Sequence, residues 1–304
     1  MPPPRLLSVV VTTYNRSDAL LAVLRALALQ RDRDFEVIVA DDGSSAEHVQ
    51  RLQAGAAGLG LDLTHTWQAD VGFTAAAARN MGVRQARGDY LVFLDGDCVP
   101  LPDFIASHRR LARPGCLVNG SRVLLGAALT ERALRGEVDL PRASWAWWLG
   151  RRLAGECNKW AGLALRWPAS LRRARAGFRW KGIRSCNLGV WRADCEAVDG
   201  FDEDFDGWGH EDADFVLRLH HHGCRRVDGF WATEVLHLWH REAARDQAQR
   251  NLDKVRRRLH DRIQRAAHGL RNPRLPELER RVRRLGPAAA GPAPAAGTAA
   301  ASRA

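Results

Sequence analysis

The stretch Gly88-Asp89-Tyr90-Leu91-Val92-Phe93-Leu94-Asp95-Gly96-Asp97 decides the fold. Its five consecutive apolar residues, Tyr90 to Leu94, predict a strand that is buried on both faces, as in a parallel sheet. Two carboxylates follow directly, Asp95 and Asp97, with Gly96 between them to let the backbone turn close to a ligand. Because open α/β sheets bind ligands at the carboxyl ends of their strands, this stretch places two oxygen donors at the expected site.

The paired carboxylates indicate a cation site. Two nearby carboxylates repel each other unless a cation lies between them, and Mg²⁺ and Mn²⁺ prefer carboxylate and phosphate oxygens. We therefore expect a divalent metal that serves a phosphate-bearing ligand. Asp-Gly-Asp alone is equally typical of a turn with two solvated carboxylates, so the surrounding chain must decide between these interpretations.

Strands and helices alternate around this stretch. The pattern predicts strands at 7–13, 35–40 and 61–67, and helices at 18–29, 46–52 and 74–86. This order is typical of parallel βαβ units. The second strand again ends in acids and a glycine, Asp41-Asp42-Gly43, whereas no GxGxxG motif follows the first strand to indicate a dinucleotide fold.

The second half of the chain is less regular. In chain order, we expect a helix at 103–111, a strand at 116–125, loosely helical structure within 126–184, a strand at 184–191, a glycine-flanked acidic loop at 200–210, a helix at 211–221 and a strand at 235–240. Residues 126–184 hold six of the eleven tryptophans, interleaved with arginines.

Composition narrows the class of protein. No run of about 18 uncharged apolar residues predicts a transmembrane helix, and the start of the chain lacks the apolar core of a signal peptide. The six cysteines are scattered without a CxxC pair, which argues against a disulfide framework and suits a reducing cytoplasm.

The net charge of +11 is concentrated in two segments. Residues 142–184 carry 11 Lys and Arg against one acid, and residues 241–285 carry 15 against 6. Residues 1–240 as a whole are close to neutral, with 30 basic and 29 acidic side chains. Such asymmetry points to a polyanion or an anionic membrane surface as a neighbour.

Five motifs in this order resemble the GT-A-fold family 2 glycosyltransferases, with a second half similar to the carboxyl-terminal region of the β-1,4-galactosyltransferase type. They are Thr12-Thr13-Tyr14-Asn15-Arg16, Asp41-Asp42-Gly43-Ser44, Ala78-Arg79-Asn80, Asp95-Gly96-Asp97 and Gly207-Trp208-Gly209-His210-Glu211-Asp212. The resemblance covers residues 7–240. It implies an α/β GT-A fold, with a mostly parallel central sheet flanked by helices.

The resemblance also implies an activity. It is that of a metal-dependent inverting hexosyltransferase that moves a hexose or N-acetylhexosamine from a nucleotide sugar, expected to be UDP-linked, to a glycan or lipid-linked acceptor. The expected role is polysaccharide or lipopolysaccharide biosynthesis. His210 stands where the galactosyltransferase type has a small residue, so we do not expect a galactosyltransferase.

Site residues can be carried over position by position. The resemblance implies that nucleotide-sugar binding involves Thr12, Tyr14, Arg16, Asp42, Arg79, Asp95 and Trp208. It makes Asp212 the catalytic base and Glu211 an acid that hydrogen-bonds a sugar. Asp97 and His240 become the metal ligands, with His237 as a competitor for the second position.

This chemistry also stands without the family. An inverting transfer needs one base to take the proton of the attacking hydroxyl, and a cation to stabilise the departing diphosphate. Mn²⁺ tolerates a mixed carboxylate and imidazole site better than Mg²⁺. The tract His220-His221-His222 lies at a predicted helix end, where charge complementarity with the helix explains it better than a metal does.

The predicted organisation is a glycosyltransferase domain at 1–240, a basic helical extension at 241–285 and a disordered tail at 286–304. The 126–184 insertion packs on the acceptor side of the sheet or faces a membrane. The extension is expected to form two basic helices separated by Pro273 and Pro276, serving as a solvated face, an oligomer contact or an anionic-lipid binder. We expect a cytoplasmic protein, with peripheral attachment to the inner face of the membrane through these basic segments.

Two alternatives belong to other classes. A sugar-nucleotide nucleotidyltransferase shares the fold and the paired carboxylates, but usually carries a glycine- and lysine-rich phosphate loop near the first strand. A basic nucleic-acid-binding protein is disfavoured by the acidic remainder of the chain and by the absence of a binding motif, so no nucleic-acid partner is expected.

Overall fold

The computed structural model describes residues 2–165, 174–175, 182–241 and 247–286. The predicted tail, apart from Gly286, and the tryptophans at 167 and 180 lie outside these residues. The main sheet consists of β1 (Leu7–Thr13), β2 (Phe35–Asp41), β3 (Leu63–Gln68), β4 (Tyr90–Asp95), β6 (Cys116–Asn119), β8 (Ala174–Arg175), β9 (Asn187–Trp191), β10 (Arg225–Asp228) and β12 (Arg280–Arg284). A smaller sheet consists of β5 (Cys98–Pro100), β7 (Ser121–Leu124) and β11 (Glu234–His237).

The helices are α1 (Ser17–Ala28), α2 (Ala46–Ala56), α3 (Ala75–Gln85), α4 (Phe104–Leu111), α5 (Ala127–Leu134), α6 (Trp145–Leu153), α7 (Ala161–Ala164), α8 (Arg192–Ala197), α9 (Glu211–His221) and α10 (Ala248–Asp261), with a 3₁₀ turn at Leu140–Arg142. No helix in the described ranges is both long and apolar enough to cross a membrane. All six cysteines are buried and none forms a disulfide.

The main sheet has the order β12-β3-β2-β1-β4-β9-β6-β10-β8. Its centre, β3-β2-β1-β4, is parallel, as the sequence predicts, and β10 pairs with β6 in parallel. Strand β9 runs antiparallel between β4 and β6. The predicted parallel α/β arrangement is therefore confirmed for the centre of the sheet, and antiparallel strands extend it on both sides.

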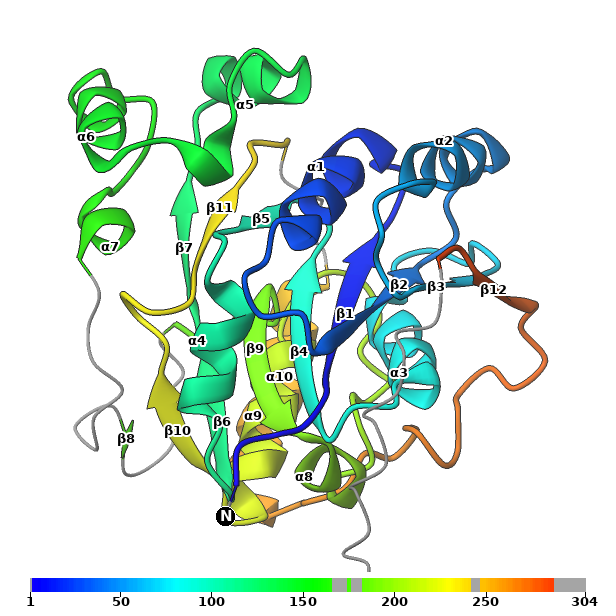
Figure 1. The fold of residues 1–304 in the computed structure, drawn as a ribbon. Coiled ribbons are helices and arrows are strands. Elements are labelled where there is room, and N and C mark those ends of the chain that lie inside the picture. Colours follow the sequence, from blue (N-terminus) through cyan, green and yellow to red (C-terminus); the bar gives the residue numbers. More distant parts are fainter. Residues whose placement is uncertain (1, 166–173, 176–181, 242–246, 287–304) are drawn as a thin grey trace, which may run out of the picture.

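Alternating side chains of the buried strands divide the core into two layers. Leu7, Val9 and Val11 of β1 face the layer that contains α1. Val10 and Phe93 face the opposite layer, which contains residues of α3, α8 and α9. Figure 1 shows the sheet between these layers, with α5, α6 and α7 grouped at one upper corner of the molecule.

The predicted single strand at 116–125 is wrong. The chain turns at Gly120, so that β6 belongs to the main sheet and β7 to the smaller one. A Cβ at Gly120 would lie 2.0 Å from the Asn187 side chain, so glycine is required where the two sheets part.

The prediction of a second basic helix within 241–285 is also wrong. Residues 248–261 form the helix α10, but Arg280–Arg284 form β12, which pairs antiparallel with β3 at the edge of the main sheet. The unpaired backbone of an edge strand is a strong template for another strand. This long-range pairing outweighs the local pattern from which a helix was expected.

Helix α9 is fixed to the sheet layer by Arg218. Its guanidinium is fully buried, with an ion pair of 2.7 Å to Asp214 and hydrogen bonds to the carbonyls of Val198 and Gly200. Arg258 of α10 adds a second cation at 2.7 Å from the Asp214 carboxylate. The first turn of α9, which holds the predicted catalytic pair, therefore rests on buried charge pairs.

We predict that Arg218→Ala lowers the free energy of unfolding by about 3 kcal/mol or more, because it removes one partner of a buried ion pair. Chemical denaturation measures this change. Arg225→Ala, at an exposed position, is the control and should change it by less than about 0.5 kcal/mol. Equal effects of the two substitutions would contradict the assignment.

Candidate active site

Three strands of the main sheet end together. Thr13 of β1 pairs with Asp41 of β2, and Thr12 pairs with Asp95 of β4. The Gly96 amide donates to the Thr12 carbonyl at 2.7 Å, and a Cβ at Gly96 would lie 2.9 Å from that oxygen. The parallel register and the close turn at Gly96 therefore bring two sets of residues to one edge of the sheet. One set is predicted to bind the nucleotide sugar, and the other is predicted to bind the metal.

At the nucleotide side of this edge, Asp42 is buried and already hydrogen-bonded. Its carboxylate accepts from Gln68 Nε2 at 2.8 Å, from the Thr74 amide at 2.8 Å and from the Thr74 hydroxyl at 2.5 Å. Burial raises the pKa of Asp42 to about 6, against the lowering effect of these hydrogen bonds. Its role in binding the nucleobase of the nucleotide sugar therefore remains a prediction.

Two neighbouring atoms have no internal partner. Among the described residues, the buried hydroxyl Oγ1 of Thr12 has no hydrogen-bond partner, and the buried amide oxygen Oε1 of Gln68 accepts no hydrogen bond. Buried polar atoms are usually paired, so unpaired ones at a strand edge are suited to a ligand. Sequence reasoning missed Gln68, and its position at the end of the third parallel strand was the available signal.

The remaining predicted nucleotide-side residues lie nearer the surface. Tyr14 is 48% exposed, and its hydroxyl donates to Asp70 at 2.8 Å. The Nε of Arg16, directly before α1, lies 3.2 Å from Asp18, so Arg16 forms an ion pair with the first turn of α1. Trp208 is 39% exposed on the loop before α9.

A second group joins β4 to α9 through Arg79. This side chain is only 4% exposed, and its guanidinium lies 3.0 Å from Glu211 Oε1 and 3.4 Å from Asp95 Oδ1. Burial raises the pKa of Asp95, while the Arg79 charge opposes the rise. Arg79, which the resemblance assigns to nucleotide-sugar binding near the donor phosphates or the base, thus forms ion pairs with two protein carboxylates.

Asp212 differs from its neighbour Glu211. Glu211 is buried against Arg79, whereas Asp212 is partly exposed and accepts from the Ser185 amide at 3.3 Å and the Ala213 amide at 2.7 Å. Burial, and next the Glu211 charge, raise the pKa of Asp212 to about 7. A carboxylate with this pKa can accept a proton near neutral pH.

The loop before α9 determines the orientation of Glu211 and Asp212. Gly207, Gly209 and His210 have φ values of +71°, +107° and +71°, so three of the four residues preceding Glu211 adopt the left-handed region. Glycine accepts this conformation readily, and His210 accepts it at a cost of about 1 kcal/mol. The turn starts α9 at Glu211, with both acids in its first turn.

A third group has the geometry of a metal site. Asp97, His237 and His240 each offer one ligand atom, and these atoms lie within 4.8 Å of one another. His240 Nε2 lies 3.2 Å and His237 Nε2 lies 3.5 Å from the Asp97 carboxylate. The pairing of β11 with β5, which places His237 opposite Cys98, brings these residues together. Both histidines fit, where sequence reasoning chose His240 and left His237 as a competitor.

The protonation of this group suits a cation. His240 Nδ1 lies 2.9 Å from the Arg241 carbonyl and must carry the proton there, so a neutral ring turns the Nε2 lone pair toward Asp97. Burial lowers the pKa of His237 to about 3 and, ahead of the Asp95 charge, raises the pKa of Asp97 to about 6. A neutral imidazole and a carboxylate facing each other need a proton or a cation between them, and a divalent metal fits.

Arg122 is a further cation that sequence reasoning missed. It lies on β7 and pairs with Val235 of β11. Leu124, two residues later and on the same face of β7, pairs with His237. Arg122 therefore lies on the same face of the smaller sheet as His237. Its guanidinium lies 3.9 Å from the Cys186 sulfur, and its charge lowers the pKa of His237 and opposes the rise of the Asp95 pKa. The alternation of side-chain directions along β7 was the sequence signal that could have indicated Arg122.

Comparison with known families identifies two regions. The model of Glycosyl transferase family 2 matches residues 8–152, and the model described as the N-terminal domain of galactosyltransferase matches residues 168–241. Residues 242–304 lie beyond both matches.

Curated relatives cover more of the chain. A validoxylamine A glucosyltransferase of Streptomyces hygroscopicus subsp. jinggangensis is 32% identical in an alignment 276 residues long, which covers 83% of this chain and 61% of that protein. A chondroitin synthase of Escherichia coli is 31% identical over 243 residues, covering 74% of this chain and 34% of the relative. The chain thus spans about three fifths or less of these proteins.

Solved structures share the fold. A mannosyltransferase from Pyrobaculum calidifontis, in complex with GDP-Man and Mn²⁺, aligns with a TM-score of 0.53 at 20% identity, over 79% of this chain and 59% of that one. Residues 1–349 of TarS from S. aureus, in complex with UDP-GlcNAc, align with a TM-score of 0.58 at 15% identity, over 87% of this chain and 68% of that one.

We predict that Asp212→Asn raises the melting temperature at pH 8 by a few degrees. The folded pKa of about 7 lies above the ordinary value of 3.8, so the ionised carboxylate destabilises the folded state. This penalty is complete above pH 7 and absent below about pH 4, where the carboxyl is protonated in both states. The gain from Asn should therefore shrink as pH falls.

Scanning calorimetry across pH measures the gain. Asp34→Asn, at an exposed position, is the matched control and should leave the melting temperature within about 1 °C. A loss of stability in Asp212→Asn at pH 8 would show that the carboxylate is not held at a cost.

Proposed function

Because the chain belongs to glycosyl transferase family 2, we propose that it is a metal-dependent inverting hexosyltransferase. It transfers a hexose or N-acetylhexosamine from a UDP-sugar to a glycan or lipid-linked acceptor in polysaccharide or lipopolysaccharide biosynthesis. One observation carries this proposal: Asp212, a carboxylate with a pKa near 7, lies in the same buried charge network as Asp95 at the strand edge. The basic segments are proposed to attach the protein peripherally to an anionic membrane surface.

Asp212 is proposed as the general base. It takes the proton of the acceptor hydroxyl while that oxygen forms a bond to the anomeric carbon of the donor sugar. The bond between this carbon and the diphosphate oxygen breaks at the same time, and the nucleoside diphosphate leaves with the electron pair. Attack opposite the leaving group inverts the configuration, so no covalent intermediate and no second nucleophilic carboxylate are required.

Glu211 and Arg79 are proposed to orient the site. The ion pairs of 3.0 Å and 3.4 Å from Arg79 hold Glu211 and Asp95 in place, so one sugar or ribose hydroxyl can bind to each carboxylate's remaining oxygen. This differs from a direct contact of Arg79 with the donor phosphates. Trp208 offers an exposed ring on which a sugar can pack.

Asp97, His237 and His240 would hold the metal, Mn²⁺ in preference to Mg²⁺ because two ligands are imidazoles. When bound, the ion supplies positive charge to the departing diphosphate. Arg122 lies beside this group and is proposed to bind a diphosphate oxygen, since its hydrogen-bond partner here is a thiol 3.9 Å away.

We predict that Asp97→Ala abolishes Mn²⁺-dependent binding of UDP and of the UDP-sugar, because two imidazoles alone are a poor site for Mn²⁺. Isothermal calorimetry with UDP-, GDP-, TDP- and CMP-sugars, with and without Mn²⁺, measures binding and identifies the donor. Asp34→Ala, at the opposite end of β2, is the control. Unchanged Mn²⁺-dependent binding in Asp97→Ala would overturn the metal assignment.

We predict that Asp212→Asn keeps donor binding and reduces the transfer rate by about 10²- to 10⁴-fold, the usual contribution of a general base. In the wild type, kcat/KM should rise with pH through about 7, because the base acts only when deprotonated. Nucleotide release measured against pH tests both expectations. Wild-type turnover by Asp212→Asn would overturn the base assignment, and release of pyrophosphate from a nucleoside triphosphate would establish a nucleotidyltransferase instead.

A further inference from the structure

Helix α10 lies beyond both family matches, yet it packs directly on the helix that begins with the catalytic pair. Val255 of α10 is fully buried against Leu217 of α9 and Phe205 of the preceding loop. Arg258 extends from the same face and lies 2.6 Å from Asp202 and 2.7 Å from Asp214, both fully buried. One face of α10 is therefore packed against the rest of the protein.

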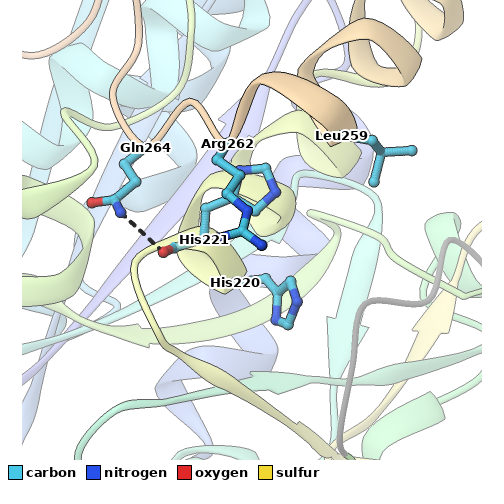
Figure 2. Close-up of a pocket in the computed structure, with 5 residues that line it drawn as sticks. All are labelled: His220, His221, Leu259, Arg262 and Gln264. Carbon is cyan, nitrogen blue, oxygen red and sulfur yellow. Dashed lines mark hydrogen bonds between the residues drawn. The ribbon is translucent and has the colours of Figure 1, made fainter.

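The two helices are tied together at their C-terminal ends. The Gln264 side chain donates to the His221 carbonyl at 3.1 Å, and the His221 ring donates to the Ile263 carbonyl at 2.9 Å. Figure 2 shows His221 and Gln264 at a pocket between the helix ends, together with His220, Leu259 and Arg262. This connection fixes α10 along α9 at the end remote from the acids.

Near its N-terminal end, α10 contacts the loop that precedes α9 and carries Trp208. The Asn251 side chain is 1% exposed, and its amide donates to the Asp206 carbonyl at 2.9 Å and to the Gly209 carbonyl at 3.0 Å. These two carbonyls stand on either side of Gly207 and Trp208. An asparagine amide has two N–H donors, so one side chain can hold both ends of the segment.

The loop needs such support. Gly207 and Gly209 have left-handed φ values, and glycine restricts the backbone less than any other residue. The near side of the loop is closely packed as well, because a Cβ on Gly207 would lie 2.9 Å from the Gln247 side chain, which directly precedes α10. The segment 206–209 is therefore held by contacts with Asn251 of α10 and with Gln247, the residue before α10.

We propose that Asn251 is a positioning residue for the transfer reaction and that α10 supports, from behind, the loop that carries Trp208. By holding both ends of the Asp206–Gly209 segment, Asn251 sets the place of Trp208 and the direction in which Glu211 and Asp212 enter α9. It acts through the loop without touching the substrate. The inference rests on the proposed function for its effect on the reaction, but its structural half can be tested without any activity.

The structural half is tested by hydrogen–deuterium exchange of the full chain. In Asn251→Ala, the amides of the first turn of α9, where Asp214 N–H donates to the His210 carbonyl at 3.0 Å, should exchange about tenfold faster or more, because the loop that places His210 loses both side-chain contacts. Gln249→Ala is the matched control, since it removes the same kind of side chain from an exposed position of α10, where the Gln249 amide donates to Asp253 at 3.0 Å. Unchanged exchange in Asn251→Ala would overturn the proposal.

The catalytic half is tested by steady-state transfer and by calorimetry with UDP and Mn²⁺. We expect kcat to fall about tenfold to a hundredfold in Asn251→Ala, the size of effect that small misplacements near a reacting centre produce. The affinity for UDP should stay within about twofold, because Thr12 and Asp42 lie on other elements. Gln249→Ala should match the wild type in both measurements.

The outcomes separate the two hypotheses. Faster exchange with unchanged kcat would overturn the positioning role, and a loss of UDP affinity equal to the loss of kcat would point to a general disturbance of the fold. A wild-type chain without turnover on any nucleotide sugar would overturn the proposed function, while the exchange result would still decide whether Asn251 holds the loop. If Asn251→Ala does not fold, Asn251→Gln keeps the amide but displaces it by one methylene, and should give the same pattern at smaller size.

Discussion

The buried guanidinium of Arg79 connects the two parts of the molecule on which the active site depends. It extends from α3 and contacts Asp95 at the end of β4 and Glu211 at the start of α9, two elements more than a hundred residues apart in the chain. A buried guanidinium is tolerable only when carboxylates compensate for the lost hydration, and each carboxylate in turn needs the cation. The distance between the strand edge and the proposed base is therefore set by a mutual electrostatic requirement.

This network also leaves an excess of negative charge. Asp95, Glu211 and Asp212 surround one guanidinium, and the repulsion between Glu211 and Asp212 is one cause of the raised pKa of Asp212. The Asp95 charge similarly contributes to the raised pKa of Asp97. This excess of negative charge thus favours proton acceptance by Asp212 and cation binding at Asp97. These are the two requirements of an inverting transfer.

The C-terminal residues complete the structure in two places. Strand β12 pairs with β3 and covers the edge of the main sheet, with Arg281 over the Trp67 ring at 4.7 Å. Helix α10 supports the loop before α9. The positive charge of this part of the chain is therefore partly used inside the protein, as the contacts of Arg258 with Asp202 and Asp214 show.

Much of the fold and of the site could be predicted from the sequence, and the reason is local. Unbroken apolar runs such as Tyr90–Leu94 have one stable environment, a strand covered on both faces, and acids that follow such strands must meet at one edge because the strands are parallel. That reasoning brought Asp42, Asp95 and Asp97 together, and the register of β1, β2 and β4 agrees with it, whereas Thr12 was identified from the family resemblance. The start of α9 at Glu211 also follows from local signals, the two glycines and the acids of the first turn.

Other features were decided by tertiary structure alone. Arg280–Arg284 became a strand because the edge of β3 was available, and the segment 116–125 divided because Asn187 occupies the space beside Gly120. His237 and His240 meet Asp97 because β11 pairs with β5, a contact between residues more than a hundred positions apart. The sequence by itself determined which chemical groups are present and which strand ends carry them. Their partners, their burial and hence their protonation depend on long-range packing, since a desolvation energy exists only once the surrounding chain has folded.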